Sequence, residues 1–90
     1  MKTVWKYELA LTDLQHLILP ENAEILKFDT QYNIPVIWVL VDTEATDVEE
    51  RVFRFCGTGH PIAKGTYQYI DTIIMADGGL VWHLFEVTDE

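Results

Sequence analysis

The chain has 90 residues, and its 15 acidic against 6 basic side chains give a formal net charge of −9. Such a charge disfavours broad electrostatic attraction to nucleic acid or to an anionic membrane, so a partner attracted by charge would be basic. The length suits a single domain over residues 1–90, and a hydrophobic content of 49% is enough to build a core.

The expected location follows from the cysteine content and from the start of the chain. A single cysteine, Cys56, excludes an internal disulfide framework, and charges at Lys2, Lys6 and Glu8 interrupt the apolar run that a signal peptide needs. The longest purely apolar run, residues 34–41, is too short to cross a bilayer as a helix. We therefore expect a soluble, cytoplasmic protein without a membrane partner.

The first part of the chain predicts strands. VWKYEL near the start and EILKFDT, residues 24–30, alternate apolar and polar side chains with the period of a half-buried strand. Between them, DLQHLILP could start a helix through a capping box of Thr12 and Gln15, but its apolar cluster stops at Pro20. Because this cluster is short for a helix, a strand over residues 15–19 is the favoured interpretation.

The most apolar segment of the chain is followed by the most acidic one. IPVIWVLV, residues 34–41, is apolar at every position and rich in β-branched residues, which is typical of a central strand covered on both faces. DTEATDVEE, residues 42–50, is rich in acids and indicates a solvated loop. Its oxygen ligands are in the wrong order for a calcium loop and it lacks the required glycine, so no metal is expected there.

The remaining segments alternate between strands and turn signals. RVFRF, residues 51–55, TYQYIDTIIM, residues 66–75, and LVWHLFEV, residues 80–87, are typical of strands, and ADGG is a hairpin turn signal. Short strands separated by turns about every ten residues, without a convincing helix, predict an all-β fold. We expect a small antiparallel sandwich or barrel of about seven strands.

FCGTGHP, residues 55–61, is the most unusual motif in the chain. Gly57 and Gly59 can adopt positive φ, and successive N–H groups in such a turn form a concavity that binds an anion. Pro61 forces His60 into an extended conformation, which fixes the direction of its imidazole. The alternative is a structural corner in which His60 bonds a neighbouring carbonyl. No helix is expected after this loop, which argues against phosphate-loop and dinucleotide-binding motifs.

Positive charges are scarce in this acidic chain, and two of them lie immediately upstream of the glycines. These are Arg51 and Arg54. We therefore expect an anionic ligand to be held by backbone N–H groups of the loop and by nearby positive side chains. The candidate ligand-binding residues are Arg54, Thr58, Gly59, His60 and Lys64.

Other chemically active residues form weaker patterns. Cys56 lies inside a predicted strand, where a small buried hydrophobe is commoner than a nucleophile. The histidines and Cys56 show no CxxC or HxxxH spacing, so neither zinc nor another cofactor is expected. His83 and the tryptophans Trp5, Trp38 and Trp82 are predicted to lie in the core.

Six pieces of the sequence carry a resemblance that covers nearly the whole chain. They are KYEL, LPENAEIL, IPVIWVLVD, FRFCGTGHPI, YIDTIIMADGG and LVWHLFE, and GTGHPI is the most specific element. With these pieces the chain resembles a family of small uncharacterised proteins of about ninety residues from bacteriophages and bacterial genomes. The acidic loop and Trp82 differ locally from the family pattern. The resemblance implies a phage or prophage accessory protein and transfers no activity.

Three functional classes remain open. The first is a non-catalytic protein that holds a small anionic ligand such as a nucleotide, by which a phage would sequester a signal of host defence. The second is an acidic inhibitor that covers a basic, nucleic-acid-binding host protein with residues 42–50. An enzyme ranks last, because no complete acid–base or nucleophile constellation is visible. The apolar content of residues 34–41 and 80–87 also predicts a homo-oligomer.

Overall fold

The computed structural model describes residues 1–88, which contain seven strands and one short 3-10 helix. The helix, η1 (Ala76–Gly78), connects the last two strands, and no helix in the described part of the chain is long and apolar enough to cross a membrane. The strands are β1 (Lys2–Glu8), β2 (Leu14–Pro20), β3 (Glu24–Gln31), β4 (Ile34–Asp42), β5 (Val48–Gly57), β6 (Tyr67–Met75) and β7 (Leu80–Val87). The predicted all-β fold is therefore confirmed.

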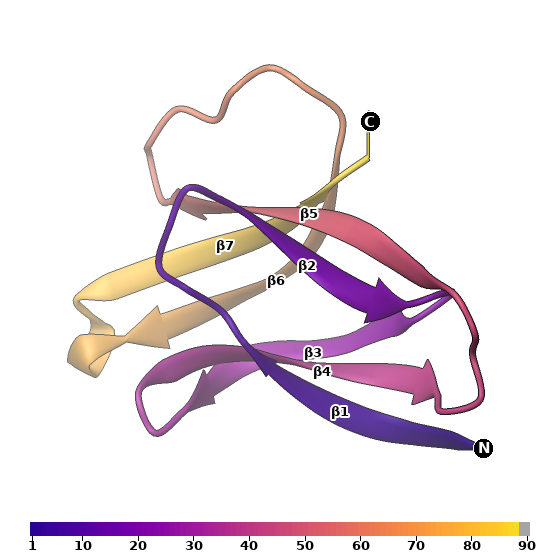
Figure 1. Cartoon of the computed structure of the whole chain (residues 1–90). Coiled ribbons are helices and arrows are strands. Elements are labelled where there is room, and N and C mark those ends of the chain that lie inside the picture. Colours follow the sequence, from indigo (N-terminus) through magenta and orange to yellow (C-terminus); the bar gives the residue numbers. More distant parts are fainter. Residues whose placement is uncertain (89–90) are drawn as a thin grey trace.

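The strands form two antiparallel sheets that pack as a small sandwich, and over residues 1–88 they do not close into a barrel. One sheet has the order β1-β4-β3 and the other has the order β2-β5-β7-β6. Figure 1 shows them as a lower and an upper layer. Side chains that point between the layers form the core, and among the largest fully buried ones are Phe28, Phe53, Leu19, Ile37 and Leu84.

β4 is the middle strand of the three-stranded sheet, as its apolar sequence predicts. Its side chains at Ile37 and Val39 are fully buried in the core. On the opposite face Val36 is also buried, whereas Trp38 and Leu40 are partly buried. The prediction that Trp38 lies in the core is therefore wrong. Side chains alternate along β4, and this alternation turns Trp38 to the outer face of its sheet.

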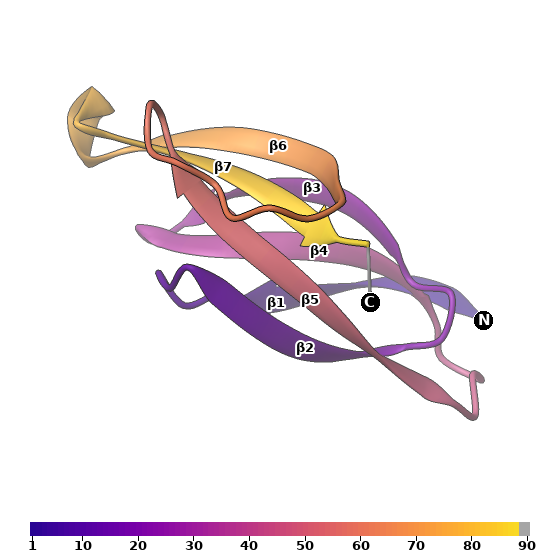
Figure 2. The ribbon, with the colours of Figure 1, turned by 90° about the horizontal axis from the view of Figure 1, so that it is seen from above.

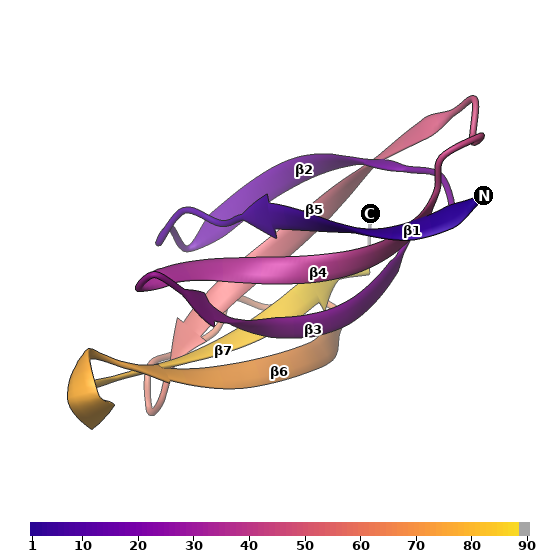
Figure 3. The same cartoon turned by 90° about the horizontal axis from the view of Figure 1, so that it is seen from below.

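The two sheets are tied together along one side, where β3 and β6 lie next to each other (Figure 3). Lys27 Nζ on β3 lies 2.9 Å from Asp71 Oδ2 on β6. Within the four-stranded sheet, Arg51 Nε on β5 lies 2.6 Å from Glu86 Oε2 on β7, and from there Arg51 Nη1 reaches across to donate to the carbonyl of Ala23, next to β3 in the other sheet. These contacts fix the position of one sheet relative to the other.

The loop in the acidic segment is shorter than the composition of this segment predicts. Residues 42–50 are expected to be a solvated loop, but β4 continues to Asp42 and β5 already begins at Val48. The backbone of β5 at this point pairs with the end of β2, so that Val48 lies opposite Pro20. Backbone pairing with a neighbouring strand overrides the loop preference of acidic side chains, which stay exposed to solvent.

The connection between β5 and β6, residues 58–66, is the longest one in the described chain and carries the motif singled out above. Figures 1 and 2 show it passing over the outer face of the four-stranded sheet. The Tyr67 hydroxyl donates to the carbonyl of Ala63 at 2.7 Å and so attaches this loop to the start of β6. The loop and the end of β5 beneath it form the walls of the candidate site.

Candidate functional site

The glycine motif forms a tight turn at the end of β5. The His60 N–H donates to the carbonyl of Gly57 at 3.1 Å, and Gly59 has a φ of +81°. The imidazole of His60 packs against Gly57, where a Cβ atom would lie only 2.8 Å from Nδ1. The two glycines are thus required for different reasons, Gly59 by its backbone conformation and Gly57 by the close approach of His60.

A pocket of about 330 Å³ lies beside this turn, where β5 extends past the start of β2, and we call it the arginine pocket. Its wall includes Arg54, Gly57 and His60, together with Asp13 and Trp82. The N–H of Phe55 donates to the carbonyl of Asp13. Because N–H groups of a strand alternate in direction, the N–H of Gly57 points to the same side, beyond the last pair of β2. It therefore faces the arginine pocket.

Two buried donors among the residues of this pocket have no hydrogen-bond partner within residues 1–88. They are Arg54 Nε and Trp82 Nε1. The Arg54 side chain is partly buried, and its guanidinium carbon lies 6.0 Å from the ring centroid of Tyr67, which fixes its position by a cation–π contact. A buried donor without a partner costs about 1–3 kcal/mol.

A second pocket, of about 280 Å³, lies on the other side of His60, and we call it the threonine pocket. Thr58 and Leu80 line it, and it shares Gly57, His60 and Trp82 with the arginine pocket. The turn at the end of β5 therefore separates two adjoining hollows. Together they offer space on both sides of one imidazole.

Thr58 stands at the end of a chain of hydrogen bonds on the outer face of the four-stranded sheet. Thr58 Oγ1 lies 2.7 Å from His83 Nε2, and His83 Nδ1 lies 2.8 Å from Thr72 Oγ1. The chain ends at the Tyr69 hydroxyl, 2.6 Å from Thr72 Oγ1. The sequence predicts His83 in the core, whereas the structure places it on the outer face, because its register partner is Cys56 and its neighbour Leu84 faces inward. Both ring nitrogens are hydrogen-bonded.

The structure brings together three of the five candidate residues. Arg54 and His60 share the arginine pocket, and Thr58 joins His60 in the threonine pocket. Gly59 shapes the turn without lining either pocket, and Lys64 is exposed in the loop and lines neither. The candidate residues between positions 54 and 64 thus lie close together, except for Lys64.

Several residues of the site escape prediction from the sequence. Trp82 reaches the site because it lies opposite Gly57 in the β5–β7 register, and Asp13 because β2 begins beside Arg54. His83 enters through its bond to Thr58. Residues so distant in the chain are brought together only by strand pairing, and no spacing in the sequence signals it.

The tryptophans and Cys56 also have roles that differ from the simplest expectation. Trp5, predicted in the core, is 43% exposed at the free edge of β1, and Trp82 packs against Phe55 with ring centroids 6.0 Å apart. Cys56 is partly buried, and its Sγ lies 3.4 Å from the carbonyl oxygen of His60. The thiol thus supports the turn through the backbone, as a weak donor would.

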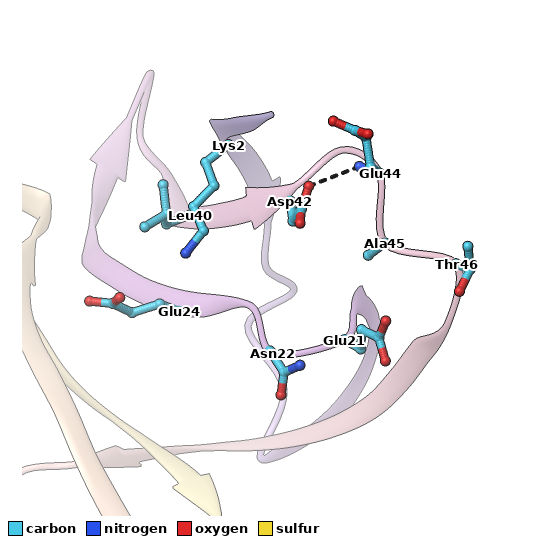
Figure 4. Close-up of a pocket in the computed structure, with 9 residues that line it drawn as sticks. All are labelled: Lys2, Glu21, Asn22, Glu24, Leu40, Asp42, Glu44, Ala45 and Thr46. Atoms are coloured by element: carbon cyan, nitrogen blue, oxygen red, sulfur yellow. Dashed lines mark hydrogen bonds between the residues drawn. The ribbon is translucent and has the colours of Figure 1, made fainter.

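The opposite end of the sandwich carries a hollow of a different kind, of about 350 Å³ (Figure 4). Four carboxylates line this acidic hollow, and Lys2 is the single basic side chain in its wall. The carboxylates belong to Glu21, Glu24, Asp42 and Glu44. Over residues 1–88, no three acids, histidines or cysteines gather in a way that could hold a metal ion.

Part of the acidic segment is held by internal contacts. The N-terminal ammonium lies 2.6 Å from Glu44 Oε2 and 3.4 Å from Asp42 Oδ1. The Glu44 backbone N–H, followed by the N-terminal ammonium, lowers the pKa of the Asp42 carboxyl below its usual value. Farther along, Glu49 accepts a hydrogen bond from the N–H of Asn22. These acids order the loop ends as well as charging the surface.

Comparison with known proteins gives one match. A family model described as a domain of unknown function (DUF7352) matches residues 1–90. No curated protein and no solved structure matches the chain. The function therefore has to be argued from the geometry of the chain itself.

Proposed function

The chain belongs to the DUF7352 family, and from the geometry of its own residues we propose that it is a binding protein for a small anionic ligand, held in the arginine pocket. The observation that carries the proposal is that the partly buried guanidinium of Arg54, whose Nε has no hydrogen-bond partner within residues 1–88, lines a pocket of about 330 Å³ together with His60. His60 and the N–H of Gly57 supply further donors on the same wall. An anion meets donors from several directions there.

The charge of the chain limits how the ligand is recognised. With a net charge of −9, the protein repels anions at long range, so affinity must come from contacts inside the pocket. Arg54 is partly buried, where its charge is less screened than on the open surface. Asp13 on the same wall favours a ligand that also carries a hydrogen-bond donor, as a nucleobase does. A nucleotide combines both features.

This chemistry agrees with the role that the resemblance implies. A phage or prophage accessory protein in the cytoplasm of the host would act by holding a nucleotide signal of host defence and keeping it from its receptor. Such sequestration needs tight binding and no chemical step.

The test is titration calorimetry with adenosine 5′-monophosphate on the full chain and on a variant carrying Arg54→Gln and His60→Gln. Loss of charge-assisted hydrogen bonds should weaken binding about ten- to hundredfold, while the melting temperature stays nearly unchanged. The matched control is Lys64→Gln, which removes one positive charge from the same loop outside both pockets. Undiminished binding with a lowered melting temperature would make the two side chains structural and overturn the proposal.

The acidic hollow supports a second candidate function, an inhibitor that covers a basic protein. Its specific support is the gathering of four carboxylates at one end of the sandwich, with Lys2 as the one basic group in the wall. Binding to a lysine-rich peptide should then weaken steeply with salt. Neutralising the four carboxylates of the hollow, Glu21, Glu24, Asp42 and Glu44, should remove it and leave binding of adenosine 5′-monophosphate intact. Equal binding by this variant would exclude the inhibitor.

Self-association remains a prediction that the surface supports. Large apolar side chains on the outer face of the four-stranded sheet are exposed, among them Ile18 at 57% and Ile74 at 66%. A homo-oligomer would cover such side chains. Light scattering at micromolar concentration should give a mass above that of the 10.4 kDa chain, and a mass equal to it would refute the prediction.

A further inference from the structure

The directions of the hydrogen bonds along the Thr58–His83–Thr72–Tyr69 chain determine what Thr58 can offer a ligand. A hydroxyl has one proton, and a neutral imidazole donates from one nitrogen and accepts at the other. If Thr58 donates into the threonine pocket, its oxygen accepts from Nε2–H of His83, and Nδ1 then accepts from Thr72. Thr72 in turn accepts from Tyr69. Two opposite sets of directions satisfy the whole chain, and this one leaves the Thr58 proton for a ligand.

The arginine and threonine pockets adjoin, so one ligand can reach both. They share Gly57, His60 and Trp82, with Arg54 on one side and Thr58 on the other. Pockets that hold small molecules in proteins usually measure about 300–1,000 Å³. The arginine pocket lies at the lower end of that range and the threonine pocket just below it. A ligand with two distinct parts makes use of the space on both sides of His60.

The charges of the two pockets differ, and this difference selects the two parts of the ligand. The arginine pocket holds Arg54 and His60, which suit an anionic group, beside the carboxylate of Asp13, which disfavours more than one negative charge. In the threonine pocket, His60 is the one titratable side chain in the wall, and the other polar side chains are the neutral hydroxyl of Thr58 and the indole of Trp82. A second full negative charge would be unpaired there and costly. A neutral hydroxyl or ether oxygen would be satisfied by the Thr58 donor.

We infer that the ligand is a phosphate monoester of a hydroxylated group, a sugar phosphate or nucleoside monophosphate, that spans both pockets. Its phosphate lies against Arg54 and His60, and a sugar oxygen accepts from Thr58. His83 acts as a positioning residue that holds the Thr58 hydroxyl in the donating direction. This inference rests on the proposed function and narrows it, because polyphosphates and inorganic phosphate would bind less well than the monoester.

The test compares three probes by titration calorimetry on the full chain: inorganic phosphate, ribose 5-phosphate and adenosine 5′-triphosphate. Ribose 5-phosphate should bind tightest. Thr58→Val should lower the affinity for ribose 5-phosphate about two- to tenfold, the effect of one neutral hydrogen bond, and leave the affinity for inorganic phosphate unchanged. Arg54→Gln should weaken both. Thr46→Val, an exposed threonine at the opposite end of the sandwich, is the matched control and should change neither.

The positioning role of His83 has its own readout. Thr72→Val removes the partner of Nδ1 and leaves Thr58 and both pockets in place. The ¹⁵N chemical shifts of the ring should show the Nε2–H tautomer of His83 in the complex with ribose 5-phosphate. In Thr72→Val the tautomer should become mixed, and the affinity for ribose 5-phosphate should fall less than in Thr58→Val. A proton on Nδ1 alone in the wild-type complex would contradict this role.

The outcomes separate the inference from the proposed function. If no probe binds, or if Arg54→Gln leaves all affinities unchanged, the anion site itself fails. If inorganic phosphate binds in an Arg54-dependent way but Thr58→Val has no effect on ribose 5-phosphate, the anion site stands and the two-part ligand is refuted. Tighter binding of adenosine 5′-triphosphate than of ribose 5-phosphate would also refute it.

Discussion

The two ends of β5 have opposite chemistry, although one strand of ten residues joins them. At its start, the acidic hollow collects four carboxylates beside a single lysine. At its end, Arg54 and His60 line the arginine pocket. The net charge of −9 reflects the acids at the first end and gives no sign of the positive side chains at the second.

The comparison teaches how a strongly acidic chain can still place positive side chains together in one pocket. The carboxylates at the first end repel an anion at the second end only weakly. A strand of this length separates the two ends by about 30 Å, several times the screening length of about 8 Å at physiological salt. Local groups therefore decide the chemistry of each end. The acids at the first end are also partly committed to structure, as the contact of Glu44 with the N-terminus shows.

Both ends depend on an intact β5. We expect the largest loss of stability from a substitution in the buried middle of this strand. Phe53 is fully buried between the two ends. Phe53→Ala should lower the free energy of unfolding by about 3–5 kcal/mol, because it leaves a cavity in the core. Urea denaturation measures this loss. Val48→Ala, at the exposed start of the same strand, should change it by less than about 0.5 kcal/mol, and similar effects of both variants would contradict the packing described.

A smaller effect should distinguish the two glycines of the turn. Gly59→Ala places a side chain at φ +81° in open space, so it should cost about 1 kcal/mol of stability through backbone strain. Gly57→Ala places Cβ 2.8 Å from His60 Nδ1, so the imidazole must move and phosphate affinity should fall with little change in stability. Calorimetry and thermal melting of both variants measure the contrast. The reverse pattern would show that the turn does not position His60.

The outcome at these glycines shows what the sequence predicts well and what it cannot. Alternation, β-branched runs and turn residues predicted all seven strands, because these are local preferences. The motif also predicted the tight turn at the end of β5, since glycine and proline have restricted uses. The approach of His60 to Gly57, and the place of Trp82 and Asp13 in the pocket, depend on pairing between distant strands. Such register is not encoded in any short stretch.

A third prediction concerns the link between the sheets, midway between the two ends. The Lys27 ammonium, followed by the N–H of Thr72, lowers the pKa of the Asp71 carboxyl. A carboxyl with a lowered pKa in the folded state stabilises the fold above its unfolded pKa, and this contribution is lost as the pH falls through the lowered value. Asp71→Asn should therefore flatten the loss of stability on the acid side, below about pH 4.

Thermal melting between neutral and acid pH tests this link, with Asp77→Asn as the control. Asp77 is an exposed acid in the turn that follows the same strand. The effect of Asp71→Asn should be smaller than that of Gly59→Ala, because Lys27 and Asp71 are both well exposed for an ion pair. If Asp71→Asn loses as much stability at acid pH as the wild type, β3 and β6 are held together by packing alone.

The smallest predicted effect tests whether the two ends are independent. Glu44 raises the pKa of the N-terminal amine through a hydrogen bond at 2.6 Å, and the contribution of this pair to stability is present at low pH and lost as the pH rises through the raised value. Glu44→Gln should return that pKa towards its ordinary value, as measured by the pH dependence of amine acylation. Because both groups are fully exposed, the melting temperature should stay unchanged. Phosphate affinity at the far end of β5 should also stay unchanged, whereas an increase would show that the acidic hollow acts on the anion site across the length of the strand.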